Sequence, residues 1–154
     1  MFLGRVFSKE TIVVPVESTE KDELFEELVE KLHAICPEFD KAEAINALLE
    51  RERALSTGIM HSVAIPHALI NGVKSSIGAI GISRDGIDWD SLDKKPVHVV
   101  FLMIGAENET ESHIQILKSL ALVLQIPEIV DKMIACDSAT SLHSLLCSAE
   151  ESLS

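Results

Sequence analysis

The sequence predicts an α/β fold, a layered sandwich in which helices flank a mixed β-sheet. Residues 97–104 form a near-continuous apolar run between Pro96 and Gly105, which is typical of a central strand covered on both faces. Amphipathic helical patterns precede and follow this run, and shorter β-branched segments lie between them. The 154 residues fit a single domain, residues 1–154, and a chain of this length can bury roughly 70% of its unfolded surface.

The N-terminal part of the chain is expected to contribute one strand and two helices. Residues 11–16 are rich in β-branched side chains and contain a proline, which predicts a short strand near an edge of the sheet. Residues 19–22 have the form of a capping box that opens a helix through Ile35. Residues 40–43 have the same form ahead of a helix that runs to about Arg53.

Two further strands are expected in the middle of the chain. Gly58 lies in a predicted turn, and residues 63–65 are predicted to form a strand that ends at a proline. Residues 76–83 predict another strand, whose glycines indicate a close-packed neighbour or a bulge. The Asp-Gly pair at 85–86 marks a turn that leads into an acidic loop.

The C-terminal part is expected to be helical. A helix should start near Thr110, with Pro127 as the first residue of the next helix and Ser138 as the cap of the last one. The predicted buried stripe of the first of these helices consists of Ile114, Leu117, Leu120, Ala121 and Leu124.

The charge balance excludes several kinds of partner. The chain has 13 basic and 25 acidic side chains, a formal net charge of −12, which disfavours binding to nucleic acid and to anionic membrane surfaces. Partners with basic patches are favoured instead. No apolar run approaches the roughly 18 residues of a membrane span, and the N-terminal apolar run is too short for a signal peptide. We therefore expect no membrane insertion and a cytoplasmic location.

The cysteines indicate neither disulfides nor a metal centre. Cys36, Cys136 and Cys147 are odd in number, widely spaced and set in apolar contexts, so they are predicted to be small core side chains in a reducing compartment. His61 and His67 are six residues apart in a partly extended segment, and no cysteine or carboxylate completes a metal set. No metal and no cofactor are expected.

Six histidines are present, and three of them favour a structural role. His33 and His143 lie in amphipathic helices, and His98 lies in the apolar strand. His67 differs because Pro66 precedes it at a predicted strand end and restricts the direction in which its imidazole is presented. By itself this is a modest indication of function.

Two other residues suit the binding of an anion. His113 falls in the first turn of a predicted helix, where free amides and the helix dipole favour negative charge. Arg51 lies on the flank of an apolar stripe and carries a permanent charge suited to phosphate oxygens. If His67, His113 and Arg51 converge, they form a phosphoryl site rather than a metal site. Periodicity does not determine whether they converge.

Several motifs together resemble the enzyme IIA domains of the bacterial phosphoenolpyruvate-dependent phosphotransferase system. The matching motifs are Arg51-Glu52, Ser56-Thr57-Gly58-Ile59, Ala64-Ile65-Pro66-His67, Gly86-Ile87-Asp88-Trp89-Asp90-Ser91-Leu92-Asp93 and Lys95-Pro96-Val97-His98-Val99-Val100-Phe101-Leu102. The branch is the mannitol/fructose class, which includes the nitrogen-regulatory enzyme IIA proteins, and the resemblance extends from about Ile12 to Leu146. The family usually carries glycines where Met60 and Ser62 stand in this chain.

The resemblance implies a mannitol/fructose-type enzyme IIA fold and a phosphotransferase. It implies that His67 is the phospho-acceptor, His113 the second active-site histidine and Arg51 a residue that stabilises the phosphoryl group. The expected donor is the phosphorylated carrier HPr or a relative, and the expected acceptor in sugar uptake is a cysteine of an enzyme IIB.

Two functions from different classes follow. The first is a relay in fructose- or mannitol-type sugar uptake. The alternative is a regulatory module whose phosphorylation state controls a partner such as a transporter, kinase or transcription factor. We expect the chain to be free-standing, without a fused enzyme IIB or membrane domain, and this expectation motivates the alternative. A structural domain that has lost transfer ranks last, because the reacting groups are all present.

Overall fold

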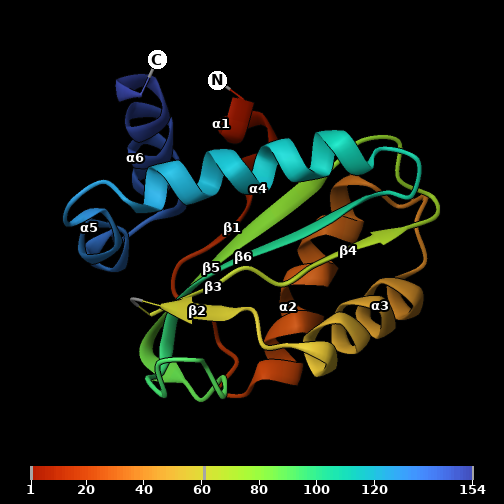
Figure 1. Ribbon diagram of the computed structural model, residues 1–154, viewed down its shortest axis with the longest axis horizontal. Coiled ribbons are helices and arrows are strands. Elements are labelled where there is room, and N and C mark those ends of the chain that lie inside the picture. The colour runs from red at the N-terminus through yellow and green to blue at the C-terminus, as the bar shows by residue number, and fades with distance from the viewer. Residues whose placement is uncertain (1, 61, 154) are drawn as a thin grey trace.

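The computed structural model describes residues 2–60 and 62–153, so the expectation for His61 falls outside the described residues. Its centre is a six-stranded mixed sheet in the order β1-β5-β6-β3-β2, with β4 also paired to β6 (Figure 1). The strands are β1 (Phe7–Val13), β2 (Gly58–Met60), β3 (Val63–Ala64), β4 (His67–Ile70), β5 (Ile77–Ile87) and β6 (Val97–Ala106). The helices are α1 (Phe2–Val6), α2 (Lys21–Ile35), α3 (Lys41–Ala54), α4 (Thr110–Leu124), α5 (Ile129–Ala135) and α6 (Ala139–Ser152).

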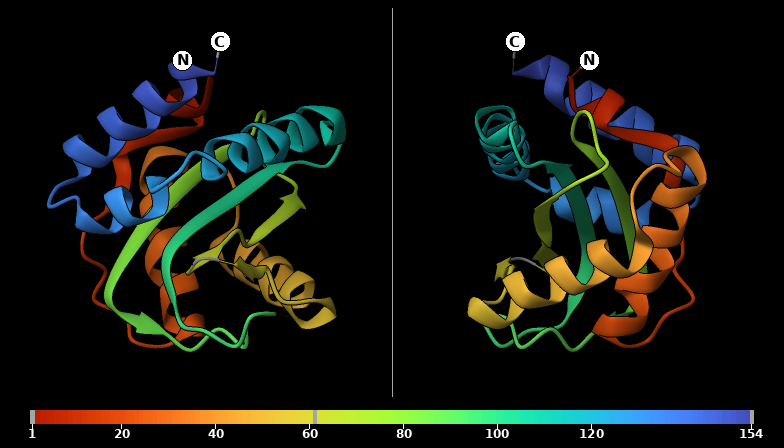
Figure 2. Two further views of the ribbon diagram at one scale, coloured as in Figure 1. Left: turned by 60° about the vertical axis from the view of Figure 1, so that its left-hand side comes forward. Right: turned by 90° about the vertical axis from the view of Figure 1, so that its right-hand side faces the viewer.

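Strand β6 is the central strand, as its apolar sequence predicts. It pairs antiparallel with β5 on one side and parallel with β3 and β4 on the other. Every residue of β6 except His98 is buried, because helices cover both faces of the sheet (Figures 1 and 2). The predicted edge strand is confirmed as well, since β1 pairs in parallel with β5 alone at one end of the order.

The two faces of the sheet carry separate cores. One core consists of the buried sides of α2 and α3 against the sheet, with Phe25, Leu28 and Trp89 among its members. The other joins α1, α4, α5 and α6 to the opposite face, around Phe7, Phe101 and Leu120. The layered α/β sandwich with a mixed sheet is therefore confirmed. Both chain ends lie beside each other, because Glu150 of α6 accepts hydrogen bonds from the backbone of Leu3 (Figure 2).

The predicted bounds of the first strand are wrong. Strand β1 begins at Phe7 and ends at Val13, ahead of Pro15, and α1 precedes it without having been predicted. A proline has no N–H to donate to the sheet, and the ladder position beyond it is instead used by Val16, whose N–H donates to the Ile82 carbonyl at 2.8 Å. The Phe7 ring lies where a side chain at Gly78 would stand, 2.3 Å from an ideal Cβ. The close-packed neighbour expected for the strand glycines is thus confirmed.

The two predicted capping boxes have different outcomes. Helix α2 is preceded by Glu20, which makes no side-chain cap, while Thr19 contacts the Glu23 carboxylate, so the first box is wrong. At α3 the Asp40 carboxylate accepts from the Glu43 N–H at 2.9 Å, which confirms the cap. The Glu43 carboxylate does not close that box, because it accepts from the Asn71 N–H instead.

The predicted turn at residues 85–86 lies inside β5. The pairing of β5 with β6 shifts register between Ile82 and Ile87, and Gly86 has a φ of 84°. The Asp-Gly pair therefore marks a bulge-like irregularity within one long strand. The predicted turn at Gly58 is likewise wrong, because Gly58 opens β2.

Helix α4 buries a different stripe from the predicted one. The buried residues are His113, Ile116, Leu120 and Val123, so only Leu120 was placed correctly, while Leu117 and Leu124 are partly buried. Ile114 is 46% exposed. This helix is apolar on several sides, and the sheet beneath it decides which side is covered.

Of the two predicted starts of the last helices, the one at Pro127 is wrong and the one at Ser138 is confirmed. Pro127 lies in a turn before α5 and not within it, because Glu128, with a φ of 66°, separates them. Ser138 caps α6 as predicted and accepts from the Ser141 N–H at 3.1 Å. The three cysteines are free and only half-buried, and Cys36 and Cys136 pack against the margins of the two cores.

Within the described residues, no single helix is long and apolar enough to cross a membrane. Helices α4 and α5, joined by a 91° bend, meet the length and composition criterion only as a pair. In the same residues no group of three or more His, Cys, Asp or Glu side chains could hold a metal ion.

Candidate functional site

His67 follows the end of β3, as predicted, but it is also the first residue of β4, a strand that was not predicted. Pro66 interrupts the ladder between β3 and β4, since it has no N–H to donate, but its carbonyl still accepts from the Met103 N–H of β6 at 2.9 Å. His67 then pairs with Met103 in the parallel register of β4 and β6. This pairing fixes the backbone of His67 to the central strand of the sheet. The residue is half-buried.

The hydrogen bonding of His67 determines its tautomer. Its Nδ1 atom lies 2.6 Å from the Ile65 carbonyl oxygen. A carbonyl oxygen only accepts, so Nδ1 carries the proton and donates it. In the neutral ring, the lone pair is therefore on Nε2. The backbone two residues upstream of His67 thus selects which nitrogen can act as a nucleophile.

His113 lies against His67. The two ring centroids are 5.5 Å apart, with 48° between the ring planes. His113 is in the first turns of α4 and only 5% exposed, and neither of its ring nitrogens has a hydrogen-bond partner among the described residues. An imidazole with unused nitrogens beside another imidazole is suited to bind a group carried by its neighbour.

Gly105 makes room for this arrangement. A Cβ atom on Gly105 would lie 2.8 Å from Nδ1 of His113 and 2.8 Å from the Ser76 hydroxyl. The Ser76 hydroxyl is also buried without a partner among the described residues. Gly105 and Ser76 are site residues that the sequence analysis missed. A glycine in an otherwise bulky buried strand was the available signal, and it was used only to mark the end of β6.

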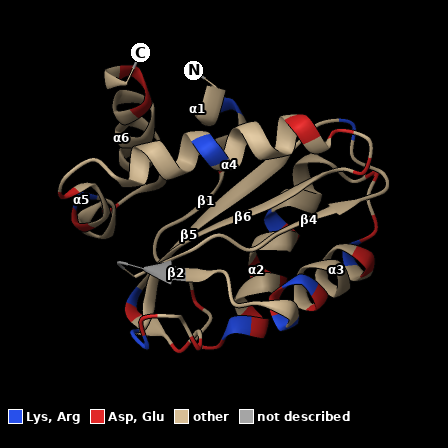
Figure 3. Cartoon of the chain, in the orientation of Figure 1, with Lys and Arg blue, Asp and Glu red and all other residues tan. Residues whose placement is uncertain are grey.

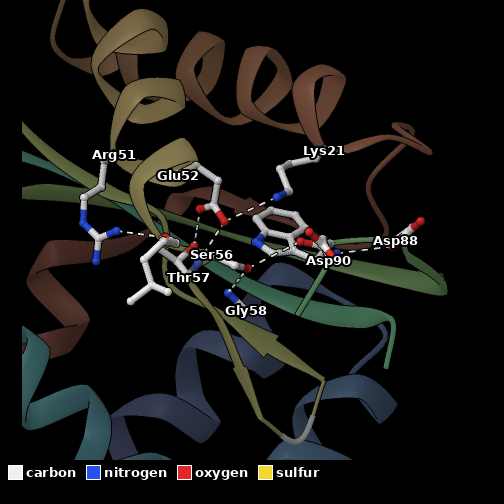
Figure 4. A network of polar contacts seen from close by, with 10 residues as sticks. Lys21, Arg51, Glu52, Ser56, Thr57, Gly58, Asp88 and Asp90 are labelled. Atoms are coloured by element: carbon white, nitrogen blue, oxygen red, sulfur yellow. Dashed lines mark hydrogen bonds and ion pairs between the residues drawn. The ribbon is translucent and has the colours of Figure 1, made fainter. Parts of the chain in front are cut away.

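Arg51 lies near the C-terminal end of α3. Its Nη1 atom donates to the Leu55 carbonyl at 3.0 Å (Figure 4). In the described part of the chain, no hydrogen bond or ion pair joins Arg51 to either histidine. Its charge nevertheless acts on His67 and lowers the pKa of that ring. The structure thus brings His67 and His113 into contact and holds Arg51 within electrostatic range.

Burial keeps both imidazoles neutral at pH 7. The pKa of His67 lies below its ordinary value, chiefly because the ring is removed from water. The hydrogen bond to the Ile65 carbonyl raises this pKa, the charge of Arg51 lowers it further, and the charge of Glu52 raises it. The pKa of His113 is lowered to about 4, first by burial and then by His67. A neutral His67 retains the Nε2 lone pair that a nucleophile requires.

A buried carboxylate whose charge acts on His67 was not assigned a role from the sequence. Glu52 is 8% exposed, and its carboxylate accepts from the N–H and the hydroxyl of Thr57 and from Lys21 (Figure 4). Glu52 follows Arg51 on α3, where charged residues of both signs alternate (Figure 3). Sequence pattern alone gives no reason to bury one of them.

Two exposed apolar residues adjoin site residues, one by a hydrogen bond and one in the sequence. Leu55, whose carbonyl binds Arg51, is 58% exposed, and Ile114, next to His113, is 46% exposed. Helix α4 carries only Glu111 and Lys118 as charged residues, so much of it is uncharged (Figure 3). Exposed apolar side chains of this size beside a site are suited to contact with another protein.

The other described histidines have partners elsewhere. His98 Nδ1 lies 2.9 Å from the Ser83 carbonyl, and His143 Nε2 lies 2.9 Å from the Gly4 carbonyl. The His33 ring lies edge-on to Phe39 at 5.2 Å between centroids. Each of these contacts is structural in character.

Comparison with known proteins identifies related chains. A family model described as "Phosphoenolpyruvate-dependent sugar phosphotransferase system, EIIA 2" matches residues 5–149. The fructose-specific EIIABC component of Bacillus subtilis is 32% identical over 146 residues, which cover 95% of this chain but 23% of that protein. The chain thus spans about a quarter of the length of this relative.

Solved structures resemble this one as well. The nitrogen regulatory protein IIA-Ntr from Neisseria meningitidis is 31% identical, with a TM-score of 0.87 over 95% of this chain and 99% of that one. An Escherichia coli complex of enzyme IIAMTL with phosphorylated enzyme IIBMTL matches at a TM-score of 0.77 over 92% of this chain and 97% of that one. At 19% identity the second likeness concerns the fold alone.

Proposed function

The chain belongs to the phosphoenolpyruvate-dependent sugar phosphotransferase system EIIA 2 family, and on this premise we propose that it is a phosphotransferase whose His67 is transiently phosphorylated. The donor is a histidine-phosphorylated carrier of the HPr type. The acceptor is a cysteine of an enzyme IIB, in sugar uptake of the fructose or mannitol type. The observation that carries the proposal is the position of the His67 and His113 rings, whose centroids are 5.5 Å apart. Nδ1 of His67 is hydrogen-bonded to the Ile65 carbonyl.

The reaction exchanges one N–P bond for another. The Nε2 lone pair of His67 attacks phosphorus in line, the N–P bond to the donor histidine breaks, and the donor nitrogen keeps that electron pair. Nδ1 of His67 keeps its proton, and the Ile65 carbonyl stabilises the positive charge that develops on the ring. In the onward transfer, the thiolate of the enzyme IIB cysteine attacks the same phosphorus, an S–P bond forms, and the N–P bond to His67 breaks with its electron pair returning to Nε2. Both steps depend on position and charge.

The two other site residues act on the phosphoryl oxygens. Arg51 supplies a permanent positive charge within electrostatic range of His67, which stabilises the negative phosphoryl group there. His113 has unused ring nitrogens beside His67, and the arrival of a doubly negative group favours its protonation, so that it becomes a donor. We propose these roles for both residues, as the family resemblance implies.

A phosphorylation assay tests the proposal. The protein is incubated with phosphoenolpyruvate, enzyme I and HPr, and acid-labile phosphate on the chain is measured. Wild type should be modified, His67→Ala should not, and His113→Ala should be modified more slowly. His33→Gln is the matched control, since it removes a histidine that contacts Phe39 on another part of the fold. A wild type that takes up no phosphate, or an equally reactive His67→Ala, contradicts the proposal.

A regulatory role is the second candidate. It is favoured by the likeness to a nitrogen regulatory IIA-Ntr protein at 31% identity over nearly all of that chain. In this case the phosphorylation state of His67 controls binding to a target protein, and no enzyme IIB is required. The exposed Leu55 and Ile114 would form part of either docking surface.

Transfer and binding assays separate the two candidates. Phosphorylated protein is mixed with candidate enzyme IIB proteins, and loss of phosphate to their cysteines supports the relay. Pull-downs compare His67→Asp with His67→Ala, and partners that distinguish these variants support regulation. Either role is proposed for a single domain, residues 1–154, that acts in the cytoplasm without nucleic acid, cofactor or metal.

A further inference from the structure

The carbonyl that orients His67 is itself held from two sides. Ile65 and Pro66 form the connection between β3 and β4. On one side the Pro66 carbonyl is tied to Met103 of the central strand. On the other side the Ile65 N–H donates to the Thr57 carbonyl at 3.1 Å. The direction of the Ile65 carbonyl, and hence that of the His67 ring, depends on where Thr57 lies.

Thr57 is held by one carboxylate. Its N–H donates to Oε2 of Glu52 at 2.8 Å, and its hydroxyl donates to Oε1 of Glu52 at 2.5 Å (Figure 4). Thr57 is 4% exposed and Glu52 is 8% exposed, so both bonds are shielded from water. Two bonds from a single carboxylate to one residue fix its backbone and its side chain together.

Glu52 is in turn held by Lys21 of α2. The Lys21 Nζ atom donates to Oε2 of Glu52 at 3.3 Å and lies 5.0 Å from the centre of the Trp89 ring. A buried carboxylate is costly unless it is paired and hydrogen-bonded, and here both conditions are met. The contacts therefore form one chain from Lys21 through Glu52, Thr57 and Ile65 to the His67 imidazole.

We propose that Glu52 is a positioning residue for His67, acting through Thr57 and the Ile65 carbonyl to hold the ring with Nδ1 protonated and Nε2 free. The inference rests on the proposed function, because a fixed tautomer matters only if His67 reacts. Glu52 itself does not touch the reacting atoms. Its effect on transfer comes through geometry and through its charge.

The charge of Glu52 gives a signature that packing alone would not produce. The charged groups that act on His67 are Arg51 and Glu52 from α3. His113 from α4 faces the His67 ring, and its own pKa is lowered by His67. Arg51 lowers the pKa of His67 and Glu52 raises it. Replacing Glu52 by glutamine keeps the shape of the side chain but removes this opposing charge, so the pKa of His67 should fall further.

The test uses unphosphorylated full-length protein for structure and the phosphorylation assay for function. Imidazole nitrogen NMR reports the tautomer and the titration of His67 in wild type, Glu52→Gln, Thr57→Val and Thr57→Ser. Thr57→Val removes the hydroxyl at nearly constant volume, and Thr57→Ser restores it. Glu50→Gln is the control, because Glu50 is an exposed residue of the same helix with the same charge.

The expected results differ among these variants. Glu52→Gln should lower the pKa of His67 and slow its phosphorylation by about tenfold or more, the scale seen when a partner that orients an imidazole is lost. Thr57→Val should add the Nε2-protonated tautomer to the spectrum and slow phosphorylation similarly. Thr57→Ser and Glu50→Gln should match wild type. If Glu52→Gln does not fold, the comparison of Thr57→Val with Thr57→Ser decides.

Specific outcomes would overturn the inference. Wild-type tautomer, titration and rate in both Glu52→Gln and Thr57→Val would show that the ring is held without this chain of contacts. Failure of the proposed function has a different appearance, since wild type would then take up no phosphate at all. The NMR readouts need no phosphate, so they test the positioning in either case.

Discussion

Replacing the buried imidazole of His113 should change how the stability of the protein depends on pH. In the folded protein the pKa of His113 is lowered to about 4, first by burial and then by the neighbouring His67. In the unfolded chain a histidine titrates near its ordinary value of about 6.5. Between these two values the unfolded chain binds a proton that the folded chain does not. Acid in this interval therefore favours unfolding, and stability rises with pH.

The size of the effect follows from the interval. Each pH unit in which only the unfolded chain is protonated changes the free energy of unfolding by about 1.4 kcal/mol. Across the interval from the ordinary value down to about 4, His113 should remove about 3 kcal/mol of stability. This stability is fully present above pH 6.5, and it is lost as the pH falls from 6.5 through the folded pKa of about 4. A loss of this size is a large fraction of the roughly 5–15 kcal/mol that holds a typical domain folded.

Urea unfolding of wild type and His113→Gln at several values between pH 4 and pH 7 measures this loss of stability. The stability difference between the two proteins should shift by about 3 kcal/mol against wild type as the solution is acidified. His67, whose pKa is also lowered, is present in both proteins and contributes in the same direction to each. Parallel curves would refute the reasoning. An NMR titration of the His113 ring with a midpoint near its ordinary value would refute it independently.

Three substitutions at other positions have expected outcomes. Ser62→Gly should raise the free energy of unfolding by up to about 1 kcal/mol in urea, because Ser62 has a φ of 67°, where a side chain is strained; a loss of stability would contradict this. Gly78→Ala should lower it by about 1–3 kcal/mol, because the new methyl meets the buried Phe7 ring, and an unchanged midpoint would show that the ring moves freely. Gly105→Ala should displace His113 and slow the phosphorylation of His67, because the new methyl group meets the His113 ring. An unchanged phosphorylation rate together with unchanged His113 resonances would contradict this.

The expected strain at Ser62 links the sequence to the structure. The family resemblance indicated glycines in this loop, and the backbone of Ser62 adopts the left-handed conformation that favours glycine. Its carbonyl accepts from the N–H groups of His98 and Val99 at 2.8 and 3.0 Å, which holds the loop against β6. Ser62 thus holds a conformation that a glycine would adopt at lower cost.

Element types were predicted where the hydrophobic period was unambiguous. Residues 97–104 form an apolar run of strand length between a proline and a glycine, and α2 shows a single apolar face, so both were placed within a few residues of their bounds. Helix α4 is apolar on several sides, and its buried face could not be chosen without the sheet. Strand β4 was missed because four residues are too few to show a period, and its partner β6 lies more than thirty positions away in the sequence.

The sequence by itself indicated which side chains are candidates for chemistry: His67 after a proline, His113 at a helix start and Arg51 with its permanent charge. It also determined the family, since local motifs are read without knowledge of the fold. Only the tertiary structure decided that His67 and His113 meet and that Arg51 lies within electrostatic range of His67. The register of β4 on β6 sets His67 opposite Met103, two positions before Gly105, and the chain then turns into α4 and returns His113 over the same strand.

The burial of Glu52 was likewise decided only by the fold. On α3 it is one of several alternating charges, and its bonds to Thr57 and Lys21 join segments whose proximity no local period encodes. A local pattern specifies the conformation of its own segment, because propensity and amphipathicity act over a few residues. Contacts between distant segments depend on strand order and register, which the whole chain settles together.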